Sequence, residues 1–489
     1  MKNQGSKFFS RRSSSIVVAG SLLAASSFTG LEAAKLSDVI NNASIDGFAF
    51  GRVHAVDGRD GEGVRYQFRF KPTITSGAIY GVSASAGLFF SKGSSTPDNN
   101  AADNDIGGSR GQTIDSLVDR FNIGDFYVTL DGKETLNTKT IVRLGQRSPG
   151  TPFNDNNLDR ALGVFAENSD IDMLNFGFQW WDSWMGDDIY ISTPSGDISS
   201  AGAGIGNNMF MAYIKSGADF TKETGLSYNL WYGGIHRWVN AMVFGDVAYT
   251  LGFDDNQSIT ITGLVSYTSM ADRPYIYGGS KSLIGLFGGN SVSNNQDWYA
   301  KNRGMYNIRV DYKYNFTQAS DEEDGAEKVT GFFGASAGLA GSFGDGFGTL
   351  IDNTGGLKLG GHLWNSYSGA EANGFGILGV GGFKNSSIIV PYVKAEIGYK
   401  KFGAALDVAY VDASHFFYLK KGSTTGTNLN NVSGNLYGAS NHIKAAHFLD
   451  VALSATYKFT DSINMLAAYG YAFGDPQFGR FRFQVNYVF

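Results

Sequence analysis

The final stretch of the chain, GRFRFQVNYVF at residues 479–489, alternates between two kinds of side chain. Arginine, glutamine and asparagine occupy the even positions 480–486, whereas phenylalanine, valine and tyrosine occupy the odd positions 481–489. Successive side chains of a β-strand point to opposite faces. The stretch therefore predicts a strand with one apolar face and one polar face.

The same alternation returns at residues 63–72 and 305–316. In a soluble sandwich, the apolar face would form the core. Two features count against that interpretation. The segments are about ten residues or longer, which is enough to cross a bilayer at a tilt, whereas soluble strands usually have about five or six residues. Aromatic residues also gather near strand ends, as at 176–180 and 469–473, where membrane interfaces favour such rings.

The composition excludes several other classes of protein. The 489 residues include 66 glycines, 8 prolines and no cysteine, with 14% aromatic and 17% charged residues. Disordered chains are poor in aromatics, and collagen needs a glycine at every third position, so neither class fits. The lack of cysteine excludes a disulfide framework. A formal net charge of −6, without a basic tract, argues against nucleic acid as a partner.

The N-terminus has the pattern of a secretory signal peptide. Lys2, Lys7, Arg11 and Arg12 precede an apolar stretch at residues 16–28. We predict a signal peptide over 1–30, with cleavage between 25 and 35. A short periplasmic segment at 31–44 and a single barrel over 45–489 would follow, in the bacterial outer membrane.

Cutting the chain at its turn signals predicts eighteen strands, an even number as a bacterial transmembrane barrel requires. The predicted strands are 45–56, 63–72, 78–91, 122–131, 138–147, 161–168, 173–184, 207–216, 225–236, 240–251, 257–268, 298–316, 328–343, 388–400, 402–412, 444–459, 462–473 and 479–489.

The connections give an independent test of this assignment. The five longest (92–121, 185–206, 269–297, 344–387 and 413–443) are all odd-numbered, so they would lie together on the extracellular side, opposite short periplasmic turns. The fold class is thus an all-β, transmembrane antiparallel β-barrel. The strand count could still lie between sixteen and twenty. A further hairpin within 344–387 would raise it, and the alternation at 161–168 is too weak to make that strand secure.

Alternation also assigns side chains to the lumen, and closure of the barrel places the last strand beside the first. The inward positions then carry a basic arc, formed by Arg52, Arg65, Arg69, Arg143, Arg147, Arg480 and Arg482. Single inward arginines are usually paired within the wall. A run of them on neighbouring strands indicates a water-filled lumen, because unpaired buried charge is prohibitive.

The connection SPGTPFNDNNLDR at 148–160 is the predicted constriction loop. In general porins the loop after the fifth strand folds into the lumen. We hypothesise that Asp155 and Asp159 face the basic arc across this constriction and sort solutes by charge. The alternative is that both aspartates are loop caps and turn formers.

Short motifs at both ends and before this loop resemble a known family. LEAAKLSDVINNASIDGFAFGR (31–52), TIVRLGQ (140–146) and YKFTDSINMLAAYGYAFG (457–474) with FQVNYVF (483–489) are similar to the major outer-membrane porins of the campylobacter and helicobacter group. The resemblance implies an eighteen-stranded homotrimer for general diffusion, cation-preferring in its known members. It also carries over Arg143 and Arg147 on the wall, and Asp155 and Asp159 on the loop. The inward arginines leave the selectivity open.

The predicted function is passive diffusion of ions and small hydrophilic solutes. The alternative is a surface adhesin or structural barrel with an occluded lumen. We expect no enzymatic activity, because no catalytic constellation is present. Tyr487 and Phe489 match the aromatic signal by which barrels are thought to be recognised for membrane insertion.

No cofactor is predicted, although calcium has weak candidate ligands in Asp103, Asp105 and Asp155. The alternative for these residues is a set of solvated acidic loops. The expected surroundings are outer-membrane lipid and lipopolysaccharide.

Overall fold

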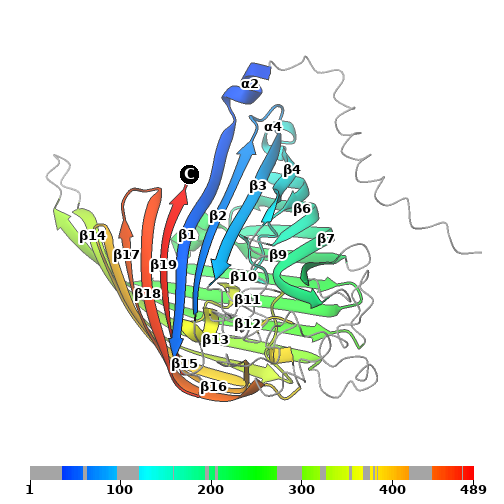
Figure 1. The fold of residues 1–489 in the computed structure, drawn as a ribbon. Helices are drawn as coiled ribbons and strands as arrows, with labels where there is room; N and C mark the ends of the chain where they lie inside the picture. The colour runs from blue at the N-terminus through cyan, green and yellow to red at the C-terminus, as the bar shows by residue number, and fades with distance from the viewer. Residues whose placement is uncertain are drawn as a thin grey trace, which may run out of the picture.

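The computed structural model describes residues 36–58, 63–95, 120–157, 159–192, 198–203, 208–272, 300–319, 327–351, 355–366, 375–377, 380–382, 384–417, 443–475 and 477–489. These residues form an antiparallel β-barrel (Figure 1). The predicted signal peptide at 1–30 lies outside the described residues.

The first half of the barrel runs from the N-terminal helix to the middle of the chain. Its elements are α2 (Leu36–Asn41), β1 (Ser44–Gly58), β2 (Gly63–Thr75), β3 (Val82–Ser95), β4 (Arg120–Asp131), α4 (Gly132–Thr135), β5 (Thr140–Arg147), β6 (Arg160–Ile171), β7 (Leu174–Ser192), β8 (Ile198–Ala203), β9 (Met209–Ser216), α5 (Ala218–Thr224) and β10 (Leu226–Ile235).

The second half contains the remaining strands and three short helical turns. Its elements are β11 (Val239–Gly252), β12 (Gln257–Met270), β13 (Asn302–Ala319), β14 (Glu327–Gly344), η2 (Gly355–Leu357), α7 (Leu363–Ser366), η3 (Val380–Gly382), β15 (Ile388–Tyr399), β16 (Phe402–Phe417), β17 (Ile443–Lys458), β18 (Ile463–Gly474) and β19 (Phe478–Val488). Among the described helices, none is long and apolar enough to cross a membrane.

The ring closes between the two ends of the chain. β1 pairs with β2 on one side and with β19 on the other. The last residue completes the seam, because Phe489 N–H donates to Gly47 O at 3.1 Å and Gly47 N–H donates to Phe489 O at 2.9 Å. Figure 1 accordingly shows α2 and the C-terminus at the same end of the barrel.

The count of eighteen strands around the ring is confirmed. β7 pairs directly with β9, so β8 lies outside the ring and extends β7 as a hairpin. Residues 185–206 were predicted as a loop, and this hairpin is a correction to that prediction. The alternation of polar and apolar residues does not distinguish a strand of the ring from a hairpin that extends beyond the ring.

Exposure alternates along the strands as the sequence pattern predicts. On β2, the side chains of Phe68 and Phe70 are 47% and 37% exposed, whereas Arg69 between them is 7% exposed. The apolar face is therefore the outside of the barrel and the polar face is the lumen. This arrangement inverts that of a soluble protein, and it matches strands that face lipid on one side and water on the other.

The connection between β14 and β15 differs from expectation. Residues 344–387 were predicted as a long extracellular loop that could hide a further hairpin. Their described part adds no strand to the ring and instead folds inside the barrel, where Phe347, Trp364 and Phe375 are completely buried. We call the described residues of this connection the inward loop.

Candidate functional site

Asp450 on β17 fastens the inward loop to the barrel wall. Its Oδ2 accepts the backbone N–H groups of His362, Leu363 and Trp364 at 3.0, 2.7 and 3.1 Å. These N–H groups lie at the start of α7, where a helix leaves its first donors without a partner inside the helix. The Asp450 side chain is completely buried, so the three bonds are shielded from water.

Arg303 at the start of β13 provides a second attachment. Its guanidinium is buried and donates to the backbone carbonyls of Ala300, Gly348, Ile377 and Gly382. Three of these four carbonyls belong to the inward loop. Because one rigid side chain holds backbone from both ends of the loop, it fixes the loop's path through the lumen.

The inward loop is also joined to the constriction loop, which we define as residues 148–159 between β5 and β6. Ile351 N–H donates to Phe153 O at 3.0 Å. Phe153 is completely buried and packs edge-on against Phe244 of β11, with ring centroids 6.0 Å apart. The two loops therefore form one internal assembly that narrows the lumen from the side of β11–β18.

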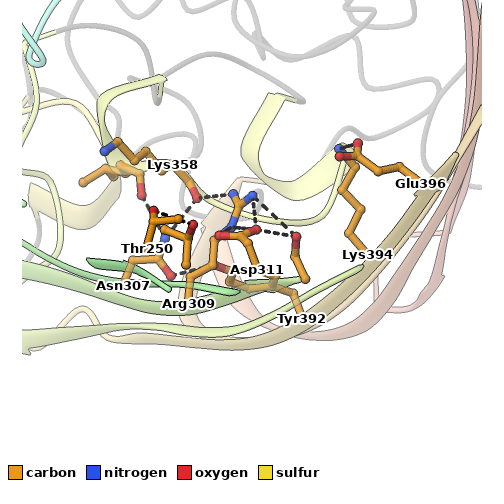
Figure 2. Close-up of polar contacts among 11 residues, drawn as sticks. Thr250, Asn307, Arg309, Asp311, Lys358, Tyr392, Lys394 and Glu396 are labelled. Carbon is orange, nitrogen blue, oxygen red and sulfur yellow. Dashed lines mark hydrogen bonds and ion pairs between the residues drawn. The ribbon is translucent and has the colours of Figure 1, made fainter. Parts of the chain in front are cut away.

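The wall beneath this assembly carries balanced charge. Arg309 and Asp311 of β13 pair with each other, and Lys394 of β15 pairs with Glu396 at 2.6 Å. Figure 2 shows these two pairs at separate places, on strands between which β14 lies. Each of these two cations therefore lies against a carboxylate on its own strand.

Lys358 of the inward loop adds a third pair. Its Nζ lies 2.8 Å from Asp246 Oδ2 on β11. The amide of Asn307 on β13 donates to the carbonyls of Leu357 and Lys358 at 3.0 Å each, and Asn307 Oδ1 accepts from the Tyr392 hydroxyl at 2.8 Å (Figure 2). The polar wall thus holds the loop by uncharged as well as charged contacts.

The opposite half of the lumen carries the predicted basic arc. Strand register places Arg482 opposite His54, and Arg69 opposite Phe50. Arg52 and Arg69 both lie over the ring of Phe50, at 4.7 and 5.1 Å from its centroid. These contacts use the flat faces of the guanidinium groups.

Arg480 and Arg482 of β19 continue the arc across the seam. Arg480 Nη2 lies 3.3 Å from Nδ1 of His54, and Arg482 Nε donates to Gln484 Oε1 at 3.0 Å. The structure therefore brings Arg52, Arg69, Arg480 and Arg482 together on adjacent strands, as the alternation predicts.

Arg143 and Arg147 on β5 occupy different surroundings. Arg143 pairs with Glu167 of β6 at 2.6 Å, so its charge is largely balanced. Arg147 lies over the rings of Tyr127 and Phe165 at 5.6 and 5.1 Å and extends the arc onto β5. Arg65 belongs to β2, but its side chain lies outside the described part of the structure.

The two aspartates of the constriction loop differ from each other. Asp159 is completely buried, and its Oδ2 accepts from Asn154 Nδ2 at 2.7 Å and from Asp155 N–H at 3.2 Å. Asp159 therefore acts as a loop cap and does not face water across a constriction, which corrects the hypothesis for this residue. Asp155 is partly exposed, and its Oδ1 accepts the N–H of Asn157 at 2.8 Å.

His362 of the inward loop is influenced by the positive charges of the basic arc. Burial and the charges of Arg480 and Arg482 lower the pKa of His362 from about 6.5 to about 4. Its imidazole is therefore neutral at physiological pH and adds no charge to the lumen.

This neutrality gives a testable pH dependence. The His362→Gln variant should have the same ion selectivity as the unmodified chain between pH 5.5 and 8, because the histidine is uncharged above a pKa of about 4. As the pH falls through about 4, protonation should add a positive charge that the variant lacks, so only the unmodified chain gains this extra anion preference. Reversal potentials across a salt gradient, compared at each pH, would measure it. A divergence of the two proteins near pH 6.5 would contradict the assignment.

The calcium prediction cannot be completed from the described residues. Asp103 and Asp105 lie outside them, and the described part of the chain holds no group of three or more His, Asp or Glu side chains suited to a metal ion. The predicted assembly signal is placed on the outer wall, where Tyr487 is 44% exposed and the Phe489 ring lies 5.9 Å from that of Phe70.

The fold is similar to that of solved outer-membrane proteins. OprD of Pseudomonas aeruginosa aligns with a TM-score of 0.54 at 12% identity, over 93% of this chain and 96% of that one. OccK8 (OprE) of the same organism aligns with a TM-score of 0.54 at 11% identity, over 92% and 99% of the two chains. OccAB3 of Acinetobacter baumannii aligns with a TM-score of 0.52 at 10% identity, over 91% of this chain and 99% of that one.

Comparison with protein-family models and with curated proteins gave no match. The resemblance to the campylobacter and helicobacter porins therefore stays a prediction from short motifs. At identities of 10–12%, the structural likeness concerns the fold. The chain has the fold of an outer-membrane porin: a closed antiparallel β-barrel of eighteen strands.

Proposed function

We propose that this chain is a porin of the bacterial outer membrane through which ions and small hydrophilic solutes diffuse passively. The observation that carries the proposal is the charged inner wall of a closed barrel. Side chains such as Arg69 and Arg482 point inward while their sequence neighbours face outward. Charged groups in such numbers are compatible with a lumen only if water fills it.

The basic arc favours anions over cations. It places the guanidinium groups of β1, β2 and β19 on three adjacent strands of the inner wall. A small carboxylate or other anion would be drawn along β19, β1 and β2. We therefore propose anion preference, in contrast to the cation preference implied by the family resemblance.

Conductance in planar lipid bilayers tests this function. The purified full-length chain should insert in discrete current steps, and a salt gradient should give a reversal potential of the sign expected for anion preference. A barrel that migrates compactly on a gel unless boiled, yet stays silent in the bilayer, would contradict the proposal.

A second candidate is a barrel whose lumen is occluded, with a role in adhesion or surface structure. The buried cluster around Trp364 and Phe375 favours it, because the inward loop fills part of the lumen with apolar side chains. The same bilayer recording separates the two candidates.

The assembly and surroundings of the barrel are further proposals. The family resemblance supports a homotrimer, which chemical crosslinking of the purified protein in detergent would reveal as a three-chain band. The exposed aromatic and aliphatic outer face supports contact with outer-membrane lipid and lipopolysaccharide.

Replacing Phe489 by serine should lower the amount of assembled barrel if Tyr487 and Phe489 serve as the assembly signal.

A further inference from the structure

We propose that the lumen holds a second solute subsite, separate from the basic arc, for uncharged polyhydroxylated solutes such as sugars. The proposal rests on the porin function proposed above. The subsite is a cavity of about 650 Å³ at the junction of the constriction loop, the inward loop and strands β9–β11. A cavity of this size falls within the range of about 300–1,000 Å³ typical of small-molecule sites.

Two of the charged groups at this cavity, Asp246 and Lys358, pair with each other. Asp246 Oδ1 accepts from Asn229 Nδ2 at 3.1 Å, and its Oδ2 lies 2.8 Å from Lys358 Nζ. Lys215 Nζ lies 5.1 Å from the centroid of the Tyr213 ring. Two lysines and two aspartates, the second being Asp155, line the cavity, so its formal charge is balanced. An ion therefore gains less electrostatic stabilisation in this cavity than along the basic arc.

Amides, hydroxyls and aromatic rings make up much of the remaining lining. They include Asn156, Asn157, Ser227, Asn229, Trp231 and Phe244. Amide and hydroxyl groups both donate and accept hydrogen bonds, as the hydroxyl groups of a sugar do. Trp231 and Phe244 are 5% and 1% exposed, so they border the cavity with small apolar surfaces that the C–H groups of a sugar can contact. This combination suits a polyol better than a purely apolar or an ionic solute.

The cavity is preformed by contacts that its walls make with each other. Trp231 is held by stacking on Tyr213, with centroids 4.3 Å apart, and by donation of Nε1–H to Asn229 Oδ1 at 2.7 Å. Gly356 of the inward loop lies so close to Pro152 that a Cβ would come within 2.1 Å of the proline carbonyl oxygen. A solute therefore meets walls that are already positioned, which lowers the entropic cost of binding.

Ser227 offers a variant that fills the cavity without removing part of its network. Its register on β10 places its side chain on the same face as Asn229 and Trp231, toward the lumen. In bilayers, maltose should reversibly reduce the current of the unmodified chain in a saturable way. Ser227→Trp should raise the half-blocking concentration about tenfold, as expected for a loss of about 1.4 kcal/mol of contacts. The matched control is Ser454→Trp, which places the same bulk on β17 away from the cavity.

A second variant guards against misfolding of the first. Asn157→Ala removes a lining amide whose backbone, rather than side chain, holds the loop. It should weaken the maltose block in the same direction. An equal block in the unmodified chain, Ser227→Trp and Asn157→Ala would overturn the subsite. Glycine betaine and gluconate test the class of solute. If either one blocks the current in a way that Ser227→Trp weakens, and maltose does not block it, the assignment of the subsite to uncharged sugars is wrong.

The porin function and the subsite fail in different ways. If the unmodified chain gives no current steps, the function is wrong. Maltose-dependent fluorescence of the detergent-solubilised barrel, which contains Trp231 in the cavity lining, then still tests the subsite by comparison with Ser227→Phe. A maltose response of the same size and half-saturation in both proteins would reject the subsite.

Discussion

Replacing Asp450 by alanine is expected to release the inward loop from β17 and to enlarge the channel. The substitution leaves the N–H groups of residues 362–364 without their acceptor. Each buried donor left unsatisfied costs about 1–3 kcal/mol. A total of about 3 kcal/mol would shift the docking equilibrium of the loop more than about 100-fold. Single-channel recording should show a higher conductance with added fluctuation between levels.

The matched controls lie at the same position and on the same strand. Asp450→Asn keeps one acceptor oxygen and should show a smaller effect. Ser454→Ala changes another inward side chain of β17 without touching the loop and should leave the conductance unchanged. If Asp450→Ala has the conductance and noise of the unmodified chain while remaining heat-modifiable on a gel, the inward loop does not depend on this carboxylate.

Replacing Arg480 and Arg482 together by glutamine is expected to abolish most of the anion preference. Each unit charge about 7 Å from a permeating ion contributes about 0.6 kcal/mol in water. Each charge acts with opposite sign on anions and cations, so loss of two charges changes the ratio by about 2.4 kcal/mol, or about 50-fold without screening. The change should be smaller in high salt because of screening. Reversal potentials in potassium chloride gradients measure this ratio.

The charge-balanced wall supplies the control for this experiment. Lys394→Gln combined with Glu396→Gln removes one positive and one negative group that pair with each other at 2.6 Å. This double variant should leave the permeability ratio nearly unchanged. An equal change in both double variants would mean that the selectivity does not arise from the basic arc.

The sequence predicted the ring of the barrel well, because each strand carries its own evidence. Alternation at 479–489 distinguishes the two faces of β19 without knowledge of any other segment. The same rule placed Arg52, Arg69, Arg480 and Arg482 on one inner surface, since closure makes the first and last strands neighbours. Local periodicity and one topological rule were sufficient for this part of the site.

The inward loop could not be placed by the same means. Its attachment depends on pairs such as Leu363 and Asp450, which are 87 residues apart and carry no shared pattern. Apolar residues in a glycine-rich loop, including Phe347, Phe375 and Ile377, were the available signal, because large apolar side chains are seldom left in water over a whole loop. That signal indicates burial but does not identify the wall that provides it.

The direction of the Asp159 side chain could not be predicted from the sequence either, although its partner is close in the chain. Its separation from Asn154 is five residues, and the loop curls so that the two side chains meet. Irregular backbone has no fixed period, so the direction of a loop side chain does not follow from its position in the sequence. The turn-former alternative was the correct one for this residue, whereas Asp155 remains partly exposed beside the proposed subsite.

The seam between Gly47 and Phe489 has a consequence for how the molecule forms. These partners stand at opposite ends of the described chain, so the ring cannot close until the last strand has been delivered. Joining two points separated by more than about 400 residues costs about 5 kcal/mol of chain entropy before the closing hydrogen bonds offset it. Until then, β1 and β19 each present an unpaired edge that can associate with another chain. Assembly of this barrel should therefore be slow and concentration-sensitive, and shielding the open edges should raise its yield.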